Sequence, residues 1–198
     1  MTSDQEKFWD ERADRFDEEV DHGLRSSDAR SAWDSLLGPL LPAGSARIAD
    51  VGCGIGSLSV LLAQRGHQVS GIDLSGAMLS RAVSKAAIAG VHVDFRKGDA
   101  ADPPLASGSF DVVLARHVLW LFQDLDTVLS NWLRLLAPKG RLILIEGRWS
   151  TGVGLTADMC HELLMRHRNS VEIHNLSDDS RLWGRAVDDE RFLAYSRD

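Results

Sequence analysis

The stretch ADVGCGIGS, residues 49–57, places glycines at alternate positions directly after a short apolar run. Residues 47–51 have the composition of a strand, and Leu58, Leu61 and Leu62 then recur at helical spacing. Glycine lets a backbone turn sharply and approach a ligand, and the start of a helix offers unpaired N–H groups. The stretch therefore predicts a strand, a tight turn and a helix, with a ligand bound at the turn.

The same alternation continues along the chain. It predicts a helix that Ser75 caps and Gly90 ends, a long helical region over 118–137, a turn at 138–140 and a helix over 156–168, followed by a loop between the last two strands. The expected strands lie at 47–51, 68–73, 91–99, 109–115, 141–146, 171–173 and 191–196. This order predicts an α/β fold with a doubly wound, mostly parallel seven-stranded sheet, which binds ligands at the carboxyl ends of its strands.

The segment before the first strand reads as helices, around residues 5–16 and 28–40. Such helices cannot belong to the sheet, so we expect them to fold over its open edge as a lid. The length of 198 residues suits one core. We therefore expect a single domain over 1–198, with a helical lid at 1–45 and a Rossmann-like core at 46–198.

The amino-acid composition disfavours several classes of function. Hydrophobic residues make up 44% of the chain, and the net charge of −7 disfavours a nucleic-acid partner. No apolar run approaches the roughly 20 residues that span a bilayer, and the acidic N-terminus does not resemble a targeting peptide. Cys53 and Cys160 fit neither a disulfide framework nor a metal cluster. We expect a cytoplasmic protein without membrane, metal or nucleic-acid binding; the oligomeric state is left open.

The glycine turn does not fit the common phosphate-binding fingerprints. A dinucleotide motif would need a third glycine or alanine where Ser57 or Ser59 stands, and no Lys-Ser/Thr pair follows as in a P-loop. Asp73 ends the second expected strand, where an acidic side chain can accept both ribose hydroxyls of a nucleoside.

Four motifs of the sequence resemble those of the class I S-adenosylmethionine-dependent methyltransferases and occur in the same order along the chain. The first is D-x-G-x-G-x-G at 50–56, followed by GIDLS at 71–75. The others are GDAADPPLASGSFDVVLARHVLW at 98–120, LAPKGRLILIEG at 136–147 and FWDERADRFD at 8–17. The last is similar to the N-terminal helix of the family's small-molecule branch, which includes the ubiquinone and menaquinone biosynthesis type.

The resemblance implies S-adenosylmethionine as cofactor and S-adenosylhomocysteine as product. The glycine loop would approach the methionyl part, Asp73 the ribose, and Asp99 the adenine amino group. The expected cofactor residues are Asp50, Gly52, Cys53, Gly54, Asp73, Leu74, Met78, Asp99, Ala100 and Arg116.

His117 is the candidate general base, because it follows the fourth strand beside the expected methyl group and its ordinary pKa is about 6.5. A purely structural role for His117, packing or capping the next helix, stays open. For the acceptor we expect Trp9, Phe16, His22 and Trp120. Phe16 stands where relatives often have tyrosine, so a hydroxyl contact to the cofactor cannot be carried over.

The sequence thus predicts transfer of a methyl group to a small metabolite or natural product, at nitrogen, oxygen or carbon. Two alternatives remain. One is a cofactor-binding module that acts through a partner without catalysis, and the other is an NAD(P)-dependent oxidoreductase on the same type of sheet.

Overall fold

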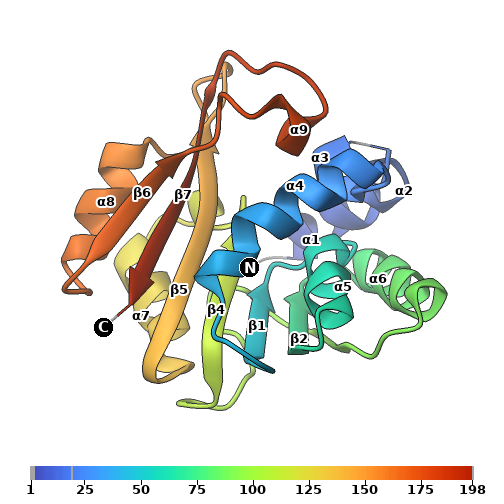
Figure 1. Ribbon diagram of the computed structural model, residues 1–198, viewed down its shortest axis with the longest axis horizontal. Coiled ribbons are helices and arrows are strands. Elements are labelled where there is room, and N and C mark those ends of the chain that lie inside the picture. Colours follow the sequence, from blue (N-terminus) through green and yellow to red (C-terminus); the bar gives the residue numbers. More distant parts are fainter. Residues whose placement is uncertain (1–2, 19, 198) are drawn as a thin grey trace.

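A computed structural model describes residues 3–18 and 20–197 of the chain. Residues 1, 2, 19 and 198, which the predicted lid and core include, lie outside the described residues. Seven strands form one twisted sheet with helices on both faces (Figure 1). The sheet confirms the predicted fold class.

The strand order is β3-β2-β1-β4-β5-β7-β6. All neighbours pair in parallel except β7, which runs antiparallel to both β5 and β6. The strands are β1 (Arg47–Val51), β2 (Gln68–Asp73), β3 (Asp94–Lys97), β4 (Phe110–Arg116), β5 (Leu136–Arg148), β6 (Val171–Asn175) and β7 (Glu190–Arg197). The order reverses between β1 and β4, and open sheets of this kind bind ligands at the carboxyl end of such a switch point.

Apolar residues cover the sheet on both faces, as a doubly wound sheet requires. Within β4, Val112 and Leu114 point into one core and Val113 and Ala115 into the other. The first core is covered by α4 (Ser27–Leu37) and α5 (Ser57–Gln64), and the second by α7 (Leu125–Arg134) and α8 (Ala157–Met165).

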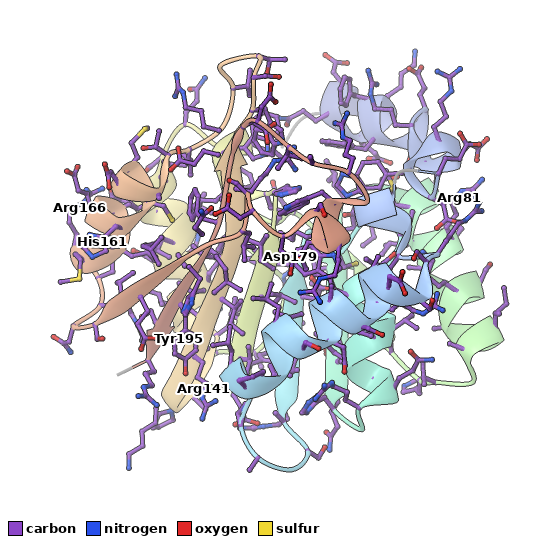
Figure 2. All side chains as sticks on the ribbon, turned by 45° about the horizontal axis from the view of Figure 1, so that its top comes forward. Arg81, Arg141, His161, Arg166, Asp179 and Tyr195 are labelled. Carbon is purple, nitrogen blue, oxygen red and sulfur yellow. The ribbon has the colours of Figure 1, made fainter. Side chains whose placement is uncertain are left out.

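The N-terminal segment divides into two parts. The short helices α1 (Ser3–Asp10), α2 (Ala13–Phe16) and α3 (Val20–Gly23) lie above the carboxyl ends of β1 and β2 (Figure 1), where one continuous helix over 5–16 was expected. By contrast, α4 and the 3-10 turn η1 (Gly38–Leu40) pack on the face of the sheet, with Trp33 fully buried. Arg141 of β5 donates to the Leu40 carbonyl and ties this part to the sheet (Figure 2). Only the part up to α3 has the position expected of a lid.

The predicted helical region over 118–137 is α-helical only in its second part. The chain instead forms a 3-10 turn, η2 (Leu119–Leu121), and α7 begins only after Asp124, whose Oδ1 accepts the Thr127 N–H at 3.1 Å. A buried carboxylate, Glu146, accepts the N–H groups of Val118 and Leu119 and thereby diverts the backbone from helix. This tertiary contact overrides the local helical pattern.

The predicted turn at 138–140 lies within β5, which starts at Leu136 and ends at Arg148. Lys139 takes the left-handed conformation, and the register against β4 shifts between Phe110 and Val112. The chain therefore bends in this region without leaving the sheet.

The other predicted elements agree with the structure to within a few residues. Ser75 caps α6 (Gly76–Ala89) by accepting the Met78 N–H, and Gly90 ends it at φ +67°. The expected loop before β7 contains one short helix, α9 (Ser180–Trp183). Within the described ranges, no helix combines the length and apolar character needed to cross a bilayer.

Candidate cofactor and acceptor cavity

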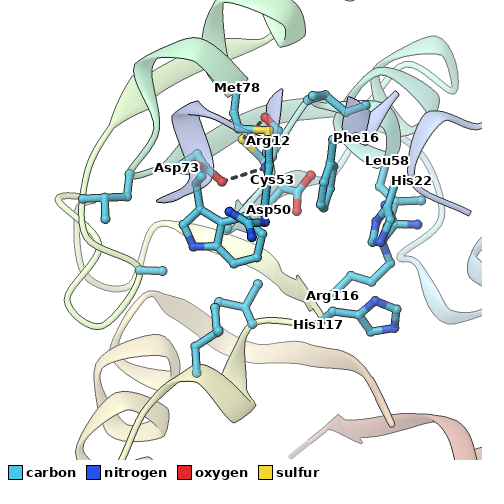
Figure 3. Close-up of a pocket in the computed structure, with 18 of the residues that line it drawn as sticks. Arg12, Phe16, His22, Asp50, Cys53, Leu58, Asp73, Met78, Arg116 and His117 are labelled. Atoms are coloured by element: carbon cyan, nitrogen blue, oxygen red, sulfur yellow. Dashed lines mark hydrogen bonds between the residues drawn. The ribbon is translucent and has the colours of Figure 1, made fainter. Parts of the chain in front are cut away.

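A cavity of about 500 Å³ opens at the carboxyl ends of β1, β2 and β4. Asp73 and His117 lie on opposite sides of it, and Phe16 and His22 lie along one rim (Figure 3). The lining residues come from six regions: the N-terminal helices, the glycine loop with its flanking β1 and α5, the end of β2 with the start of α6, the loop after β3, the turn after β4 and the segment after β5. They are Trp9, Arg12, Arg15, Phe16, His22, Asp50, Gly52, Cys53, Gly54, Ile55, Leu58, Asp73, Leu74, Met78, Ala100, Arg116, His117, Val118, Trp120, Leu121, Trp149, Arg185 and Arg191.

The glycine loop forms the floor of this cavity in a conformation that only glycine adopts without strain. Gly52, Gly54 and Gly56 have φ of +71°, +54° and +72°. A Cβ atom on Gly52 would lie 2.4 Å from Cγ2 of Val118, so packing also excludes a side chain at this position. A Cβ on Gly54 would meet only the Phe16 ring, at 3.7 Å, so its backbone faces open space.

Asp73 fixes the loop from the end of β2. Its Oδ2 accepts the Gly54 N–H at 2.8 Å and its Oδ1 accepts the Ser75 N–H at 2.9 Å. Burial raises the pKa of this carboxyl group above its ordinary value, and the backbone donors oppose the shift. Each carboxylate oxygen has a second lone pair, so Asp73 can accept further hydrogen bonds from the cavity.

Asp50, at the end of β1, is buried and accepts a hydrogen bond from the Ser59 hydroxyl at 2.5 Å. Burial raises its pKa to about 6, while Ser59 and the charge of Arg116 counteract the shift. Asp50 is therefore largely ionised at neutral pH and holds the start of α5 against β1.

Beyond Asp73, the cavity wall consists of Leu74, Met78 and Ala100. Met78 is 2% exposed and packs against Ile55. Asp99, the remaining residue expected at the adenine, is not among the described residues that line the cavity. Its Oδ1 accepts the Ala101 N–H at 2.8 Å.

His117 follows β4 in the left-handed conformation, at φ +59°. Its ring lies edge-on to Trp149 at 5.2 Å and to His22 at 5.8 Å between ring centroids, and stacks near Trp183 at 5.9 Å. Burial, followed by the charges of His22 and Arg116, lowers the pKa of His117 well below 6.5. The ring is neutral at physiological pH, and its buried Nε2 has no hydrogen-bond partner among the described residues.

Glu146 supports the turn that carries His117, and the sequence analysis missed it. Its Oε1 accepts the N–H groups of Val118 and Leu119 at 3.0 and 2.7 Å. Burial raises the pKa of Glu146 to about 8, against those two donors. An acidic residue at the end of an otherwise apolar strand was the available signal, because a buried carboxyl needs partners.

The N-terminal helices provide the roof, made by residues 9–18 and 20–22. Phe16 stacks on His22 with ring centroids 4.1 Å apart, and Trp9 meets Phe16 edge-on at 6.1 Å. Asp10 accepts hydrogen bonds from the Ser75 hydroxyl and the Ala77 N–H, which fastens α1 to the start of α6.

The C-terminal wall, made by Trp149, Arg185 and Arg191, was also missed as a unit. Arg191 lies 5.8 Å from the ring centroid of Trp149 and 4.7 Å from that of Trp183, which is buried and is not among the described lining residues. Its side chain is fixed by a bidentate ion pair to Asp189. Trp149 is far from the two arginines in sequence, and no local motif connects the three.

The structure thus brings together the predicted residues at one cavity, with Asp99 as the exception. Those that line it are Trp9, Phe16, His22, Asp50, Gly52, Cys53, Gly54, Asp73, Leu74, Met78, Ala100, Arg116, His117 and Trp120. Their individual roles toward a ligand stay predictions.

Comparison with known proteins agrees with this arrangement. Residues 49–144 match the family model described as a methyltransferase domain. Nocamycin O-methyltransferase from Saccharothrix syringae is 40% identical over 111 residues, which are 54% of this chain and 40% of that protein. Demethylmenaquinone methyltransferase from Thermus thermophilus is 37% identical over 102 residues, which are 50% of this chain and 46% of that protein. The chain spans less than half the length of these two relatives.

Solved structures show the same fold over a longer range. The N-methyltransferase NodS from Bradyrhizobium japonicum, solved in complex with S-adenosylhomocysteine, has a TM-score of 0.72. The match covers 96% of this chain and 98% of that one at 21% sequence identity. The [4+2]-cyclase SpnF has a TM-score of 0.73 over 85% of this chain and 80% of its own, also at 21% identity.

Proposed function

We propose, from the match of residues 49–144 to a methyltransferase domain, that the chain is an S-adenosylmethionine-dependent methyltransferase for a small organic acceptor. The observation that carries the proposal is the pairing of an open glycine backbone with Asp73 at the carboxyl ends of β1 and β2. The names of the nocamycin and demethylmenaquinone relatives, which act on small molecules, support the acceptor class.

The residues of the cavity floor fit the cofactor. The Gly54 backbone faces open space, so a methionyl group can approach it closely. Asp73 retains acceptor capacity for ribose hydroxyls, and Met78 and Ala100 offer an apolar wall to the adenine. The bound cofactor supplies a methyl group already activated on a sulfonium. The protein then has mainly to position the acceptor, which can contribute about 7 to 11 kcal/mol to lowering the barrier.

His117 is placed to receive the proton of a hydroxyl or amine acceptor. Its pKa is lowered by burial, so the ring is neutral at physiological pH and one nitrogen is free to accept. The His117 ring lines the cavity and lies close to the rings of His22, Trp149 and Trp183. These rings exclude water from the proposed site of transfer.

We further propose that the chain acts as one domain in which the roof, residues 9–18 and 20–22, covers the bound cofactor and acceptor. Trp9, Phe16 and His22 supply its apolar surface. The lack of a nucleic-acid partner and a cytoplasmic location stay predictions from charge and sequence.

Calorimetry with S-adenosylhomocysteine and with NADH tests the cofactor assignment. We expect binding of the first and none of the second. Binding of NADH alone would favour an oxidoreductase and contradict the proposal.

Methyl transfer is then measured by mass spectrometry with S-adenosylmethionine and a panel of phenols, amines and enolisable metabolites. In His117→Ala and His117→Gln, turnover should fall by about 10²- to 10⁴-fold with unchanged S-adenosylhomocysteine affinity. Normal turnover in both variants would return His117 to a structural role. Cofactor binding without transfer to any acceptor would favour the non-catalytic module.

A further inference from the structure

The charges that line the cavity are unevenly distributed. Among the described lining residues the acidic side chains are Asp50 and Asp73, both on the glycine-loop side. The basic ones are five arginines, Arg12, Arg15, Arg116, Arg185 and Arg191. The protein as a whole carries a net charge of −7, so the excess positive charge inside the cavity opposes the overall balance. Charge concentrated in a cleft of this kind selects a ligand of opposite sign.

Two of these arginines belong to the C-terminal wall. Arg191 donates through Nε and Nη2 to the carboxylate of Asp189, at 2.7 and 3.0 Å. The two side chains are only 7% and 9% exposed. Burying an ion pair costs desolvation free energy. The bidentate geometry of this pair fixes the direction in which the Arg191 guanidinium faces. Even with Asp189 counted, arginines outnumber carboxylates around the cavity.

Arg191 and His117, the candidate base, lie at the same part of the cavity. Arg191 lies against the rings of Trp149 and Trp183, and the His117 ring lies 5.2 and 5.9 Å from the same two indoles. The charge of Arg191 also contributes to the lowered pKa of His117. A ligand that reaches His117 therefore lies within the field of Arg191.

Arginines elsewhere in the cavity are closer to the glycine loop. Arg116 acts electrostatically on Asp50 and lies 5.2 Å from the Trp33 ring centroid. Arg12 donates to the Phe8 carbonyl in the roof. Arg116 thus lies between the glycine loop and His117, because its charge acts on both Asp50 and His117. Arg185 and Arg191 belong to the C-terminal wall alone, so we assign these two to the acceptor.

Aromatic rings complete the acceptor side, in the form of His22, His117, Trp120 and Trp149. Flat aromatic walls favour a planar ligand. The indole faces of Trp149 and Trp183 already carry the Arg191 guanidinium, so a second cation there would be repelled. The wall thus favours an anion over an ammonium group.

We propose that the methyl acceptor is a planar, aromatic-type molecule with an anionic group that Arg185 and Arg191 bind while His117 faces its nucleophilic atom. This inference rests on the proposed function. With a hydroxyl acceptor, its oxygen forms the new bond to the methyl carbon, and the carbon–sulfur bond breaks with its electron pair on sulfur. The hydroxyl proton passes to the unprotonated ring nitrogen of His117 and later to water.

The test compares matched acid and amide probes on protein saturated with S-adenosylhomocysteine. The probes are 4-hydroxybenzoate with 4-hydroxybenzamide, and 6-hydroxy-2-naphthoate with its amide, measured by tryptophan fluorescence and calorimetry. We expect each acid to bind about 10-fold or more tightly than its amide, because charge-assisted hydrogen bonds are the stronger ones.

Arg185→Gln and Arg191→Met should each remove most of this preference and leave S-adenosylhomocysteine affinity within about twofold of wild type. Arg185 is exposed, so its variant tests the idea even if Arg191→Met disturbs the buried pair. Arg181→Met is the matched control. That arginine lies in the same segment, pairs with Asp179 and is not among the described lining residues; its variant should keep the preference.

Three results would each overturn the inference. Acid and amide could bind equally well, every acid could fail to bind at millimolar concentration, or Arg185→Gln could keep the preference for the acid. Failure of S-adenosylhomocysteine itself to bind wild-type protein would instead contradict the proposed function. The two failures are therefore distinguishable.

Discussion

The floor and the roof of the cavity are built in different ways. The floor, residues 50–56 with Asp73, is held by backbone hydrogen bonds and buried side chains: the N–H groups of Gly52 and Cys53 both donate to the Ile72 carbonyl. The roof, residues 9–18 and 20–22, is held by side-chain contacts: Trp9, Ala13 and Phe16 pack on Ile55 and Met78, and polar side chains pair with α6. The comparison teaches that the floor is part of the folding core, whereas the roof depends on contacts that can be removed singly.

The surface pairs of the N-terminal helices illustrate the difference. Glu6 pairs with Lys97 and Asp14 with Arg81 of α6 (Figure 2). Exposed ion pairs of this kind typically contribute about 0 to 1 kcal/mol each. We therefore expect changes in the floor to affect both folding and binding, and changes in the roof to affect mainly binding.

The largest effect is expected for Gly52→Ala. The left-handed backbone costs about 1 to 2 kcal/mol for a residue with Cβ, and overpacking against Val118 adds about 1 to 3 kcal/mol. Urea unfolding should show this loss, and calorimetry should show no S-adenosylhomocysteine binding. Gly66→Ala is the matched control, because Gly66 has φ +86° but no described atom within 4 Å of a Cβ. If the two variants lose the same stability, packing against Val118 is unimportant.

The next effect concerns Glu146, below the His117 turn. Its pKa is raised by burial from an ordinary 4.5 to about 8, so between these values the native state binds more protons than the unfolded state. The stability that Glu146 contributes is therefore lost as pH rises through this window, by up to about 1.4 kcal/mol per pH unit. In Glu146→Gln the free energy of unfolding, measured in urea from pH 5 to 8, should fall less with pH than in wild type. Parallel curves would contradict the assignment.

Asp73→Asn tests the floor through binding. Asparagine has one carbonyl oxygen, so it cannot accept from Gly54, Ser75 and a ribose together as the carboxylate can. We expect about a 10- to 100-fold loss of S-adenosylhomocysteine affinity by calorimetry. Asp94→Asn is the control, since Asp94 pairs with Arg96 on β3, away from the lining residues. If Asp73→Asn binds S-adenosylhomocysteine as tightly as wild type does, Asp73 does not contact the ligand.

A smaller effect is expected in the roof for Asp10→Ala. This change removes the contact of α1 with Ser75 and Ala77, which should cost about 1 kcal/mol or less in the free energy of unfolding. Because Trp9 and Phe16 are then less firmly placed, S-adenosylhomocysteine should dissociate several-fold faster in stopped-flow fluorescence. Asp4→Ala, on the exposed side of α1, is the control. A loss of stability as large as that of Gly52→Ala would show that the roof belongs to the folding core.

The smallest effect is expected for Lys97→Gln. The pair with Glu6 is exposed on both sides, with side-chain exposures of 53% and 35%. Thermal unfolding should be unchanged within error in high salt, where such pairs are screened. A clear loss of melting temperature there would indicate that the roof is anchored more strongly than the comparison assumes.

The sequence could predict what short-range chemistry determines. The glycine turn, Asp73 after β2 and the Ser75 cap of α6 each follow from neighbouring residues, and the structure places them as expected. The positions of Glu146 below the His117 turn and of Arg191 in the cavity depend on partners in other segments of the chain, which local patterns do not identify. The same holds for the part of 118–137 that is not α-helical, because Glu146 binds its backbone.

One contact has a consequence for the order in which the cavity is made during synthesis. The indole N–H of Trp33 in α4 donates to the carbonyl of Leu182 in α9, across 149 positions of sequence. The glycine loop and β2 leave the ribosome long before α9 exists, so the floor of the cavity is synthesised well before its C-terminal wall. The cavity is therefore complete only when nearly all of the chain has emerged, because Arg185 and Arg191 follow α9 in the sequence.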